Sequence, residues 1–197
     1  MKACESFLIV PGLHDSNAEH WQSRWQERFN LPRLIQPDWS TPDIDVWAQA
    51  LERFVPKLAE PVVILAHSFG CLATIFAATR LRGKVRAALL VAPPDPVKFG
   101  LDHRISNHGI PFPSIVVASR NDPWITIDRA NEWADRWQSS FVDLGKAGHI
   151  NSEAGFGDWP EGWDLARSLA GSGQLLRAAS PAKAEQRAFV SDSLHLD

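Results

Sequence analysis

Residues 61–70, which read PVVILAHSFG, constrain the fold of this chain more than any other stretch. Val62 to Leu65 form an unbroken apolar run, which predicts a central parallel strand that is covered on both faces. Small residues stand two positions before and after Ser68, and only Ala66 departs from the pattern G-x-S-x-G. An apolar run typical of a buried helix follows, so the stretch predicts a nucleophile elbow with a strained serine. On its own, the pattern also fits an ordinary strand–helix turn.

Length and composition indicate an ordinary globular protein. A chain of 197 residues with 45% hydrophobic and 22% charged residues suits one domain with a sizeable core. The net charge of -3 argues against nucleic acid or an acidic membrane as a partner. The apolar run at 7–10 is too short for a signal peptide, and no run approaches the roughly 20 residues that cross a bilayer. Cys4 and Cys71 make no disulfide framework, so we expect a cytoplasmic protein.

Strand-like and helix-like segments alternate along the chain. Short apolar runs predict strands at 7–10, 34–35, 62–65, 85–92, 115–118 and 141–144. Helices are expected to begin at Ser16, which forms a capping box with Glu19, and at residues 40–43, where Pro42 suits the first helical position. Further helical patterns lie at 71–78, from 127 and near 163–169. This alternation predicts an α/β fold with a mainly parallel sheet of about six strands and helices on both faces.

Two segments fall outside this alternation. Residues 93–112 hold four prolines and two glycines without a clear period, which predicts a long loop or partial lid. From Gly171 onward the chain consists largely of Gly, Ser, Ala and charged residues, and a short helix is expected near 181–190. We therefore expect an α/β domain at 1–171 and a loosely attached C-terminal tail at 172–197.

Three reactive side chains follow predicted strands: Ser68, Asp122 and His149. Because parallel strands end at one edge of the sheet, these residues are expected to converge there. A serine hydroxyl needs a base, for which His149 is the candidate, and Asp122 would hold the imidazole in the required tautomer. The chain order Ser, Asp, His is that of the α/β-hydrolases. Asp143, the rival acid, lies inside the last predicted strand, where a structural role suits it better.

Other groups are expected around the reacting centre. The N–H of Phe69, next after the serine, and the N–H of Leu13, in the loop after the first strand, are candidate oxyanion donors. Gly12 would let that loop approach closely, because it has no Cβ. His14 and Trp124 are candidate substrate contacts.

The remaining histidines are assigned no catalytic role. We expect His67 to point away from the cleft in a hydrogen-bonded structural role, and His103 and His108 to be solvated. No spacing of Cys, His and carboxylate residues predicts a metal site, and no cofactor is expected.

Several blocks of the sequence resemble the small serine-hydrolase family that includes retinoblastoma-binding protein 9 and related bacterial proteins proposed to be esterases. The resemblance spans about residues 5–170 and rests on Pro11-Gly12, His20-Trp21, Trp39 with Pro42, and the segments at 66–70, 119–123, 148–151 and 155–160. The blocks at 119–123 and 148–160 are specific to this family rather than to α/β-hydrolases at large. The motif Leu-x-Cys-x-Glu, through which the human member binds retinoblastoma protein, does not occur in this chain.

The resemblance implies a minimal α/β-hydrolase fold without a large cap domain and a triad at Ser68, Asp122 and His149. We therefore expect a serine hydrolase that cleaves small acyl esters through an acyl-enzyme intermediate. Two alternatives stay open: an amidase or aminopeptidase with the same triad, and a protein-binding module whose triad is vestigial. The expected partner is a small ester or amide, and neither a protein partner nor the oligomeric state is predicted.

Overall fold

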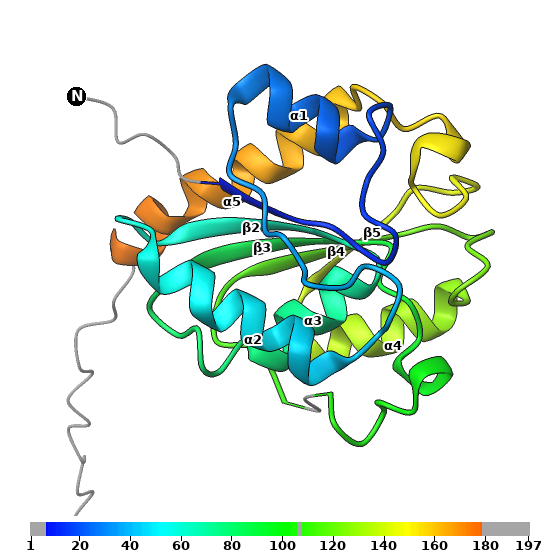
Figure 1. The fold of residues 1–197 in the computed structure, drawn as a ribbon, viewed down its shortest axis with the longest axis horizontal. Coiled ribbons are helices and arrows are strands. Elements are labelled where there is room, and N and C mark those ends of the chain that lie inside the picture. The colour runs from blue at the N-terminus through cyan, green and yellow to red at the C-terminus, as the bar shows by residue number, and fades with distance from the viewer. Residues whose placement is uncertain (1–6, 106–107, 179–197) are drawn as a thin grey trace, which may run out of the picture.

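A parallel β-sheet forms the centre of the molecule (Figure 1). The computed structural model describes residues 7–105 and 108–178. Within these residues, 5 strands pair in chain order: β1 (Phe7–Val10), β2 (Val62–His67), β3 (Val85–Val91), β4 (Ser114–Ala118) and β5 (Ser140–Asp143). All of these pairings are parallel, so the connections must cross over from one end of the sheet to the other.

Helices cover both faces of this sheet, as the alternating sequence predicts (Figure 1). One face carries α1 (Trp21–Phe29) and α5 (Pro160–Ala178), and the other carries α2 (Ile44–Phe54), α3 (Phe69–Ala77) and α4 (Ile127–Trp137). Short 3-10 segments are η1 (Val55–Lys57), η2 (Pro96–Phe99) and η3 (Ser152–Ala154). The described part of the chain contains no large cap domain, so loops and the short segments η2 and η3 cover the carboxyl edge of the sheet.

Strand β2 is buried along its whole length, as its unbroken apolar run predicts. Its side chains alternate between two cores. Ile64 belongs to the core under α2, α3 and α4, which includes Trp47, whereas Leu65 belongs to the core under α1 and α5, which includes Trp21 and Trp25. Each such large apolar side chain contributes about 1.5–3 kcal/mol by leaving water. The strand that precedes Ser68 is therefore held firmly from both faces.

Helix α1 begins at Trp21 rather than at Ser16, so the predicted capping box is wrong. Ser16 is buried, and its hydroxyl donates to Gln22 Oε1 at 2.6 Å instead of capping a helix. Gln22 is drawn inward because its Nε2 donates to the backbone carbonyl of Leu65 at 2.9 Å. The cap is His20, whose Nδ1 accepts from the Gln22 N–H. Tertiary hydrogen bonds thus override the local pattern.

The segment between α1 and α2 also differs from the expectation. The strand expected at 34–35 is replaced by a single bridge between Ile9 and Arg33. Prolines flank this segment, and proline has no N–H with which to extend a ladder. The cap of α2 is Asp43, whose carboxylate accepts two backbone N–H groups, so Pro42 lies before the helix and not at its first position.

The C-terminal part of the chain is described only in part. Helix α5 continues through Ala178, so the expected boundary at residue 171 falls within this helix. The rest of the expected tail, with the helix expected near 181–190, lies outside the described residues, as does Cys4. The assignment of residues 172–197 as a separate tail therefore stays a prediction.

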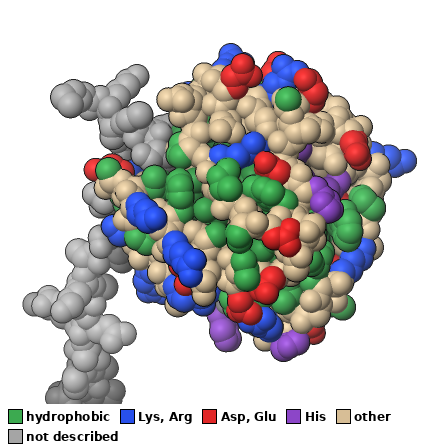
Figure 2. Space-filling view, in the orientation of Figure 1, with side chains coloured by type: hydrophobic (Ala, Val, Ile, Leu, Met, Phe, Trp, Pro, Cys, Tyr) green, Lys and Arg blue, Asp and Glu red, His purple; other side chains and the backbone are tan. Residues whose placement is uncertain are grey.

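The surface carries charges of both signs. Figure 2 shows Lys and Arg side chains interspersed with Asp and Glu side chains on one face, with apolar side chains between them. Some of these charges pair on the surface, as Arg80 does with Glu52 and Arg104 with Asp45. Exposed pairs of this kind contribute only about 0–1 kcal/mol each. Among the described helices, none is both long and apolar enough to span a bilayer.

Candidate active site

Ser68 occupies the turn between β2 and α3 in a strained backbone conformation. Its φ is 52° and its ψ is -128°, a region in which a residue with a side chain costs about 1–3 kcal/mol. The strain persists because the Ser68 N–H donates to Val91 O at 3.0 Å and the Ser68 carbonyl accepts from Cys71 N at 2.9 Å. The sheet and the helix therefore hold this residue from both sides, as the elbow pattern predicts.

Two glycines allow the chain to pass close to this turn. A Cβ on Gly70 would lie 2.3 Å from the carbonyl oxygen of Pro11, which is backbone that cannot move aside. A Cβ on Gly12 would lie 2.7 Å from Ser68 Cβ and 3.3 Å from Ser68 Oγ. The loop after β1 therefore runs directly beside the serine hydroxyl, and both positions require glycine for a close approach.

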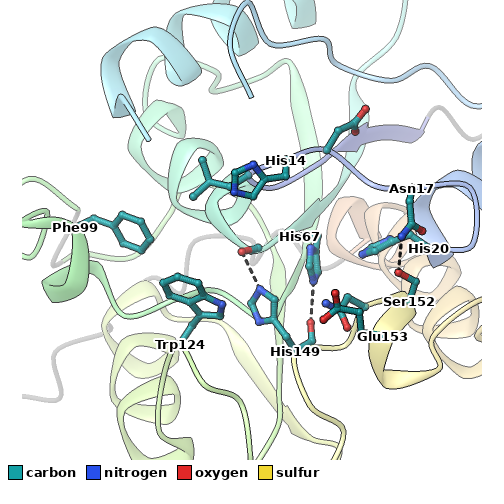
Figure 3. A pocket seen from close by; sticks show the side chains of 13 residues that line it. His14, Asn17, His20, His67, Phe99, Trp124, His149, Ser152 and Glu153 are labelled. Carbon is teal, nitrogen blue, oxygen red and sulfur yellow. Dashed lines mark hydrogen bonds between the residues drawn. The ribbon is translucent and has the colours of Figure 1, made fainter. Parts of the chain in front are cut away.

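The structure brings together the three residues that the sequence singles out. His149 Nε2 lies 2.9 Å from Ser68 Oγ (Figure 3). His149 Nδ1 lies 2.9 Å from Asp122 Oδ2 and 3.1 Å from Asp122 Oδ1. When Nδ1–H donates to the carboxylate, Nε2 is free to accept the serine proton. The arrangement forms a continuous chain from a buried carboxylate to a strained serine, which is what general-base activation of a nucleophile requires.

The carboxylate of Asp122 is fully buried, with a side-chain exposure of 0%. Its Oδ1 also accepts the backbone N–H of Trp124 at 2.8 Å, which fixes the orientation of the carboxylate toward the imidazole. Asp143 has other partners: it accepts from Arg120 Nε at 2.7 Å and from the Gly145 N–H at 2.8 Å. The carboxylate that accepts the hydrogen bond of His149 is therefore that of Asp122 and not that of Asp143.

Ser119 and Asn121 connect the loop that carries Asp122 to the loop that carries His149. The sequence analysis assigned neither residue an individual role. Ser119 is completely buried, and its hydroxyl accepts the Ala147 N–H at 2.9 Å. Asn121 Oδ1 accepts both the Ser119 hydroxyl at 2.8 Å and the Gly148 N–H at 2.8 Å. These bonds fix the spacing between the loops, and the only sequence signal for them was the family block at 119–123.

His67 does not point away from the cleft, so that part of the prediction is wrong. It lines the pocket, and its Nε2–H donates to the backbone carbonyl of His149 at 2.9 Å (Figure 3). Burial lowers the pKa of His67 well below its usual value, with further contributions from the nearby His20 and His149. Burial, followed by the charges of Arg33 and His149, lowers the pKa of His20 to about 3. Both side chains are therefore neutral donors at neutral pH.

Two backbone N–H groups flank the serine hydroxyl. Phe69 is the first residue of α3, and Leu13 follows Gly12 in the loop that passes beside Ser68. Neither N–H has a hydrogen-bond partner among the described residues. These are the two donors expected from the sequence, and both lack a partner in the part of the chain that the structure describes.

A cavity of about 340 Å³ opens above these groups. Figure 3 shows Phe99 and Trp124 on one side of His149, and Asn17, His20, Ser152 and Glu153 on the other. The predicted contacts His14 and Trp124 both line this cavity. Phe99 belongs to the long loop at 93–112, and sequence reasoning did not identify it, because nothing in its local pattern marks it as facing the site. Within the described residues, no group of three or more His, Cys, Asp or Glu side chains could hold a metal ion.

The comparisons with known proteins agree with this geometry. A family model described as serine hydrolase matches residues 7–168, a segment that contains Ser68, Asp122 and His149. The chain belongs to the serine hydrolase family. This assignment makes it a hydrolase with an α/β-hydrolase fold.

Solved structures of similar proteins share the fold of this serine hydrolase. A protein described as a YdeN-like hydrolase from Pectobacterium atrosepticum is 40% identical, with a TM-score of 0.80 over 87% of this chain and 91% of that chain. The ydeN gene product of Bacillus subtilis is 20% identical, with a TM-score of 0.67 over 84% and 98%. Est1E of Butyrivibrio proteoclasticus, solved with ferulic acid bound, is 14% identical, with a TM-score of 0.64 over 89% and 90%. The last two show the fold alone. No curated protein sequence matches this chain.

Proposed function

We propose that this serine hydrolase cleaves small acyl esters, with Ser68 as nucleophile, His149 as general base and Asp122 as the acid that orients the base. The main support for the proposal is the continuous chain of contacts from Asp122 through His149 to the strained Ser68. The Asp122 Oδ2–His149 Nδ1 distance and the His149 Nε2–Ser68 Oγ distance are both 2.9 Å. A vestigial site has no need to keep a strained serine in line with a buried carboxylate.

The reaction follows from this chain of groups. Ser68 Oγ attacks the ester carbonyl carbon while His149 Nε2 takes the hydroxyl proton, and Asp122 stabilises the imidazolium that forms. The carbon–oxygen bond to the leaving alcohol then breaks, and the imidazolium returns its proton to that oxygen. Water attacks the acyl-enzyme with His149 again as base, which releases the acid and restores the Ser68 hydroxyl.

The oxyanion of each tetrahedral intermediate would be stabilised by the N–H groups of Phe69 and Leu13. Both donors are unpaired within the described residues, and Gly12 brings the second one beside the serine. Removing one donor of this kind costs about 10²–10³-fold in kcat in other serine hydrolases. His14 and Trp124, which line the cavity, would contact the substrate.

A small acyl group suits this site. The cavity of about 340 Å³ lies near the lower limit of small-molecule pockets, and no large cap extends it within the described part of the chain. No cofactor enters the mechanism. We also propose that the protein is cytoplasmic, since it has two cysteines and no disulfide framework. The net charge of -3 is the reason for proposing no nucleic acid or membrane partner.

Hydrolysis of short p-nitrophenyl esters tests the proposal. We expect turnover of acetyl and butyryl esters, because His149 Nε2 lies where it can accept the serine proton. The Ser68→Ala variant should lose it. Faster turnover of the matching anilides than of the esters would favour the amidase alternative. Folded protein without any activity would favour the binding-protein alternative, and preference for long-chain esters would contradict the small acyl pocket.

A further inference from the structure

The cavity above Ser68 has two chemically different walls. Leu13, Phe99 and Trp124 supply apolar and aromatic surface on one side. Asn17 and Glu153 belong to the opposite wall, where the other side chains are also polar (Figure 3). A substrate that fills both walls must therefore be apolar at one end and polar at the other.

The two halves of an ester can be assigned to these walls. The apolar and aromatic wall suits the acyl chain, which carries no polar group. The leaving oxygen must face His149 Nε2, which returns its proton. The polar wall, which Glu153 lines, is then left for the leaving alcohol.

The polar wall carries an unpaired negative charge. Glu153 lines the cavity, is exposed to solvent, and takes part in no ion pair within the described residues. The other carboxylate in the lining, Asp15, lies 3.5 Å from Arg33 and is thereby partly neutralised. His20 and His67 cannot supply a compensating positive charge, because burial keeps both rings neutral.

The segment that holds Glu153 is fixed in place. Asn17 Nδ2 donates to Ser152 Oγ at 2.9 Å, and Trp21 Nε1 donates to the carbonyl of Ile150 at 3.0 Å. The Asn151 side chain caps the short η3 segment by accepting the Ala154 N–H at 3.1 Å. The backbone that carries Glu153 therefore need not be ordered when a ligand binds, and only its exposed side chain adjusts.

A second observation indicates that this wall lacks a ligand. His20 is 4% exposed and lines the cavity, and its Nδ1 accepts the Gln22 N–H. The proton of the neutral ring must then be on Nε2, and that buried atom has no hydrogen-bond partner among the described residues. A buried donor without an acceptor is costly, and what it lacks is a hydrogen-bond acceptor, so the preference for a positive charge comes from Glu153 alone.

We propose that the polar wall binds the leaving alcohol of the substrate, and that this alcohol carries a positive charge opposite Glu153. The substrate class is then esters of amino alcohols with a small apolar acyl group. This inference rests on the proposed esterase function and specifies its leaving group. The nearest cation on the aromatic side is Lys98, whose ammonium donates to the Pro123 carbonyl at 2.7 Å and does not line the cavity.

Three esters with the same acyl group test this inference: butyrylcholine, its neutral isostere 3,3-dimethylbutyl butyrate, and an anionic 3-carboxypropyl butyrate. The ratio of kcat/KM for the cationic ester to that for the neutral ester is measured in the wild type and in Glu153→Gln. Intrinsic differences in leaving-group reactivity cancel in this comparison. We expect the ratio to fall about threefold to fivefold in Glu153→Gln, the size of a solvent-exposed charge pair, with the neutral ester little changed.

Two further variants sharpen the result. Glu153→Lys should lower the ratio about tenfold or more and raise the relative rate of the anionic ester, because the charge is reversed rather than removed. Glu161→Gln, at an exposed carboxylate in the first turn of α5 outside the cavity lining, should leave the ratio unchanged. High salt should shrink the wild-type ratio toward that of Glu153→Gln.

The outcomes separate this inference from the function on which it rests. A wild type that hydrolyses the neutral ester while the ratio stays the same in Glu153→Gln overturns the inference alone. An equal fall in Glu161→Gln also overturns it, because the effect would then reflect the overall charge of the protein. If no ester is hydrolysed and Ser68 does not react with a fluorophosphonate, the esterase function fails, and the inference fails with it.

Discussion

His67 donates a hydrogen bond from Nε2 to the backbone carbonyl of His149 at 2.9 Å. The residue before the proposed nucleophile thus holds the main chain of the proposed general base, and the two residues are 82 positions apart. This bond couples the elbow to the loop after β5, so the distance between Ser68 and His149 depends on it. A displacement of about 1 Å at such a site can cost as much as 10²-fold in rate.

The coupling predicts different outcomes for two substitutions of His67. Glutamine can place its Nε2 donor near that of histidine, so His67→Gln should keep kcat within about threefold of the wild type. His67→Leu leaves the His149 carbonyl without its donor and should lower kcat about 10–100-fold while KM changes little. Steady-state kinetics on a butyryl ester gives both constants. Equal kcat values for the two variants, at equal thermal stability, would contradict a positioning role.

Asp122 and Asp143 can be compared directly as candidate acids. Asp122→Asn keeps the shape of the side chain but favours the wrong imidazole tautomer, and in serine proteases such a change lowers kcat about 10⁴-fold. Asp143→Asn removes an exposed partner of Arg120 and should change kcat less than about tenfold. Circular dichroism confirms folding before the kinetics are compared. Greater damage from Asp143→Asn would reverse the assignment of the acid.

Gly70 is predicted to be a stability determinant. In Gly70→Ala the new methyl would lie 2.3 Å from the Pro11 carbonyl oxygen, so β1 and α3 must move apart, and such overpacking costs about 1–3 kcal/mol or more. Gly171→Ala is the matched control, because nothing lies within 4 Å of its added Cβ. That change should be neutral or stabilise helix α5 by about 0.5–1 kcal/mol. Urea unfolding measures both, and a Gly70→Ala variant as stable as the control would refute the close approach.

Stability should fall below neutral pH because of the buried histidines. The pKa of His20 is lowered to about 3 in the folded state, whereas the unfolded chain has the usual value of about 6.5. The unfolded state therefore binds more protons as the pH falls through 6.5, and from pH 7 to pH 5 the free energy of unfolding should drop by about 2 kcal/mol for this residue. The lowered pKa of His67 acts in the same direction.

His20→Asn isolates this contribution. Asparagine is a favourable helix cap and can replace Nδ1 as the acceptor of the Gln22 N–H, but it does not titrate in this range. The variant should therefore lose about 2 kcal/mol less than the wild type between pH 7 and pH 5, as measured by urea unfolding at each pH. Parallel pH curves for the two proteins would show that His20 is not buried in its neutral form.

The sequence predicts those parts of the site that depend on local patterns. The apolar run before Ser68 and the small residues around it predict the elbow, and the strand-ending positions of Asp122 and His149 predict their convergence. The start of α1 could not be predicted in this way, because the Gln22 side chain donates hydrogen bonds to carbonyls of β1 and β2, which are distant in sequence. The contact between His67 and the His149 carbonyl is equally nonlocal, and residue types alone do not determine where a backbone oxygen lies.

The most direct test of the account is the intact mass of the protein after reaction with a fluorophosphonate, followed by peptide mapping. We expect one adduct per chain, located on Ser68, because His149 Nε2 lies where it can take the serine proton. Ser68→Ala should form none, and Asp122→Asn should react far more slowly than Asp143→Asn. A folded wild-type protein that takes no adduct between about pH 5 and about pH 8, or an adduct on another serine, would contradict the assignment of Ser68 as the nucleophile.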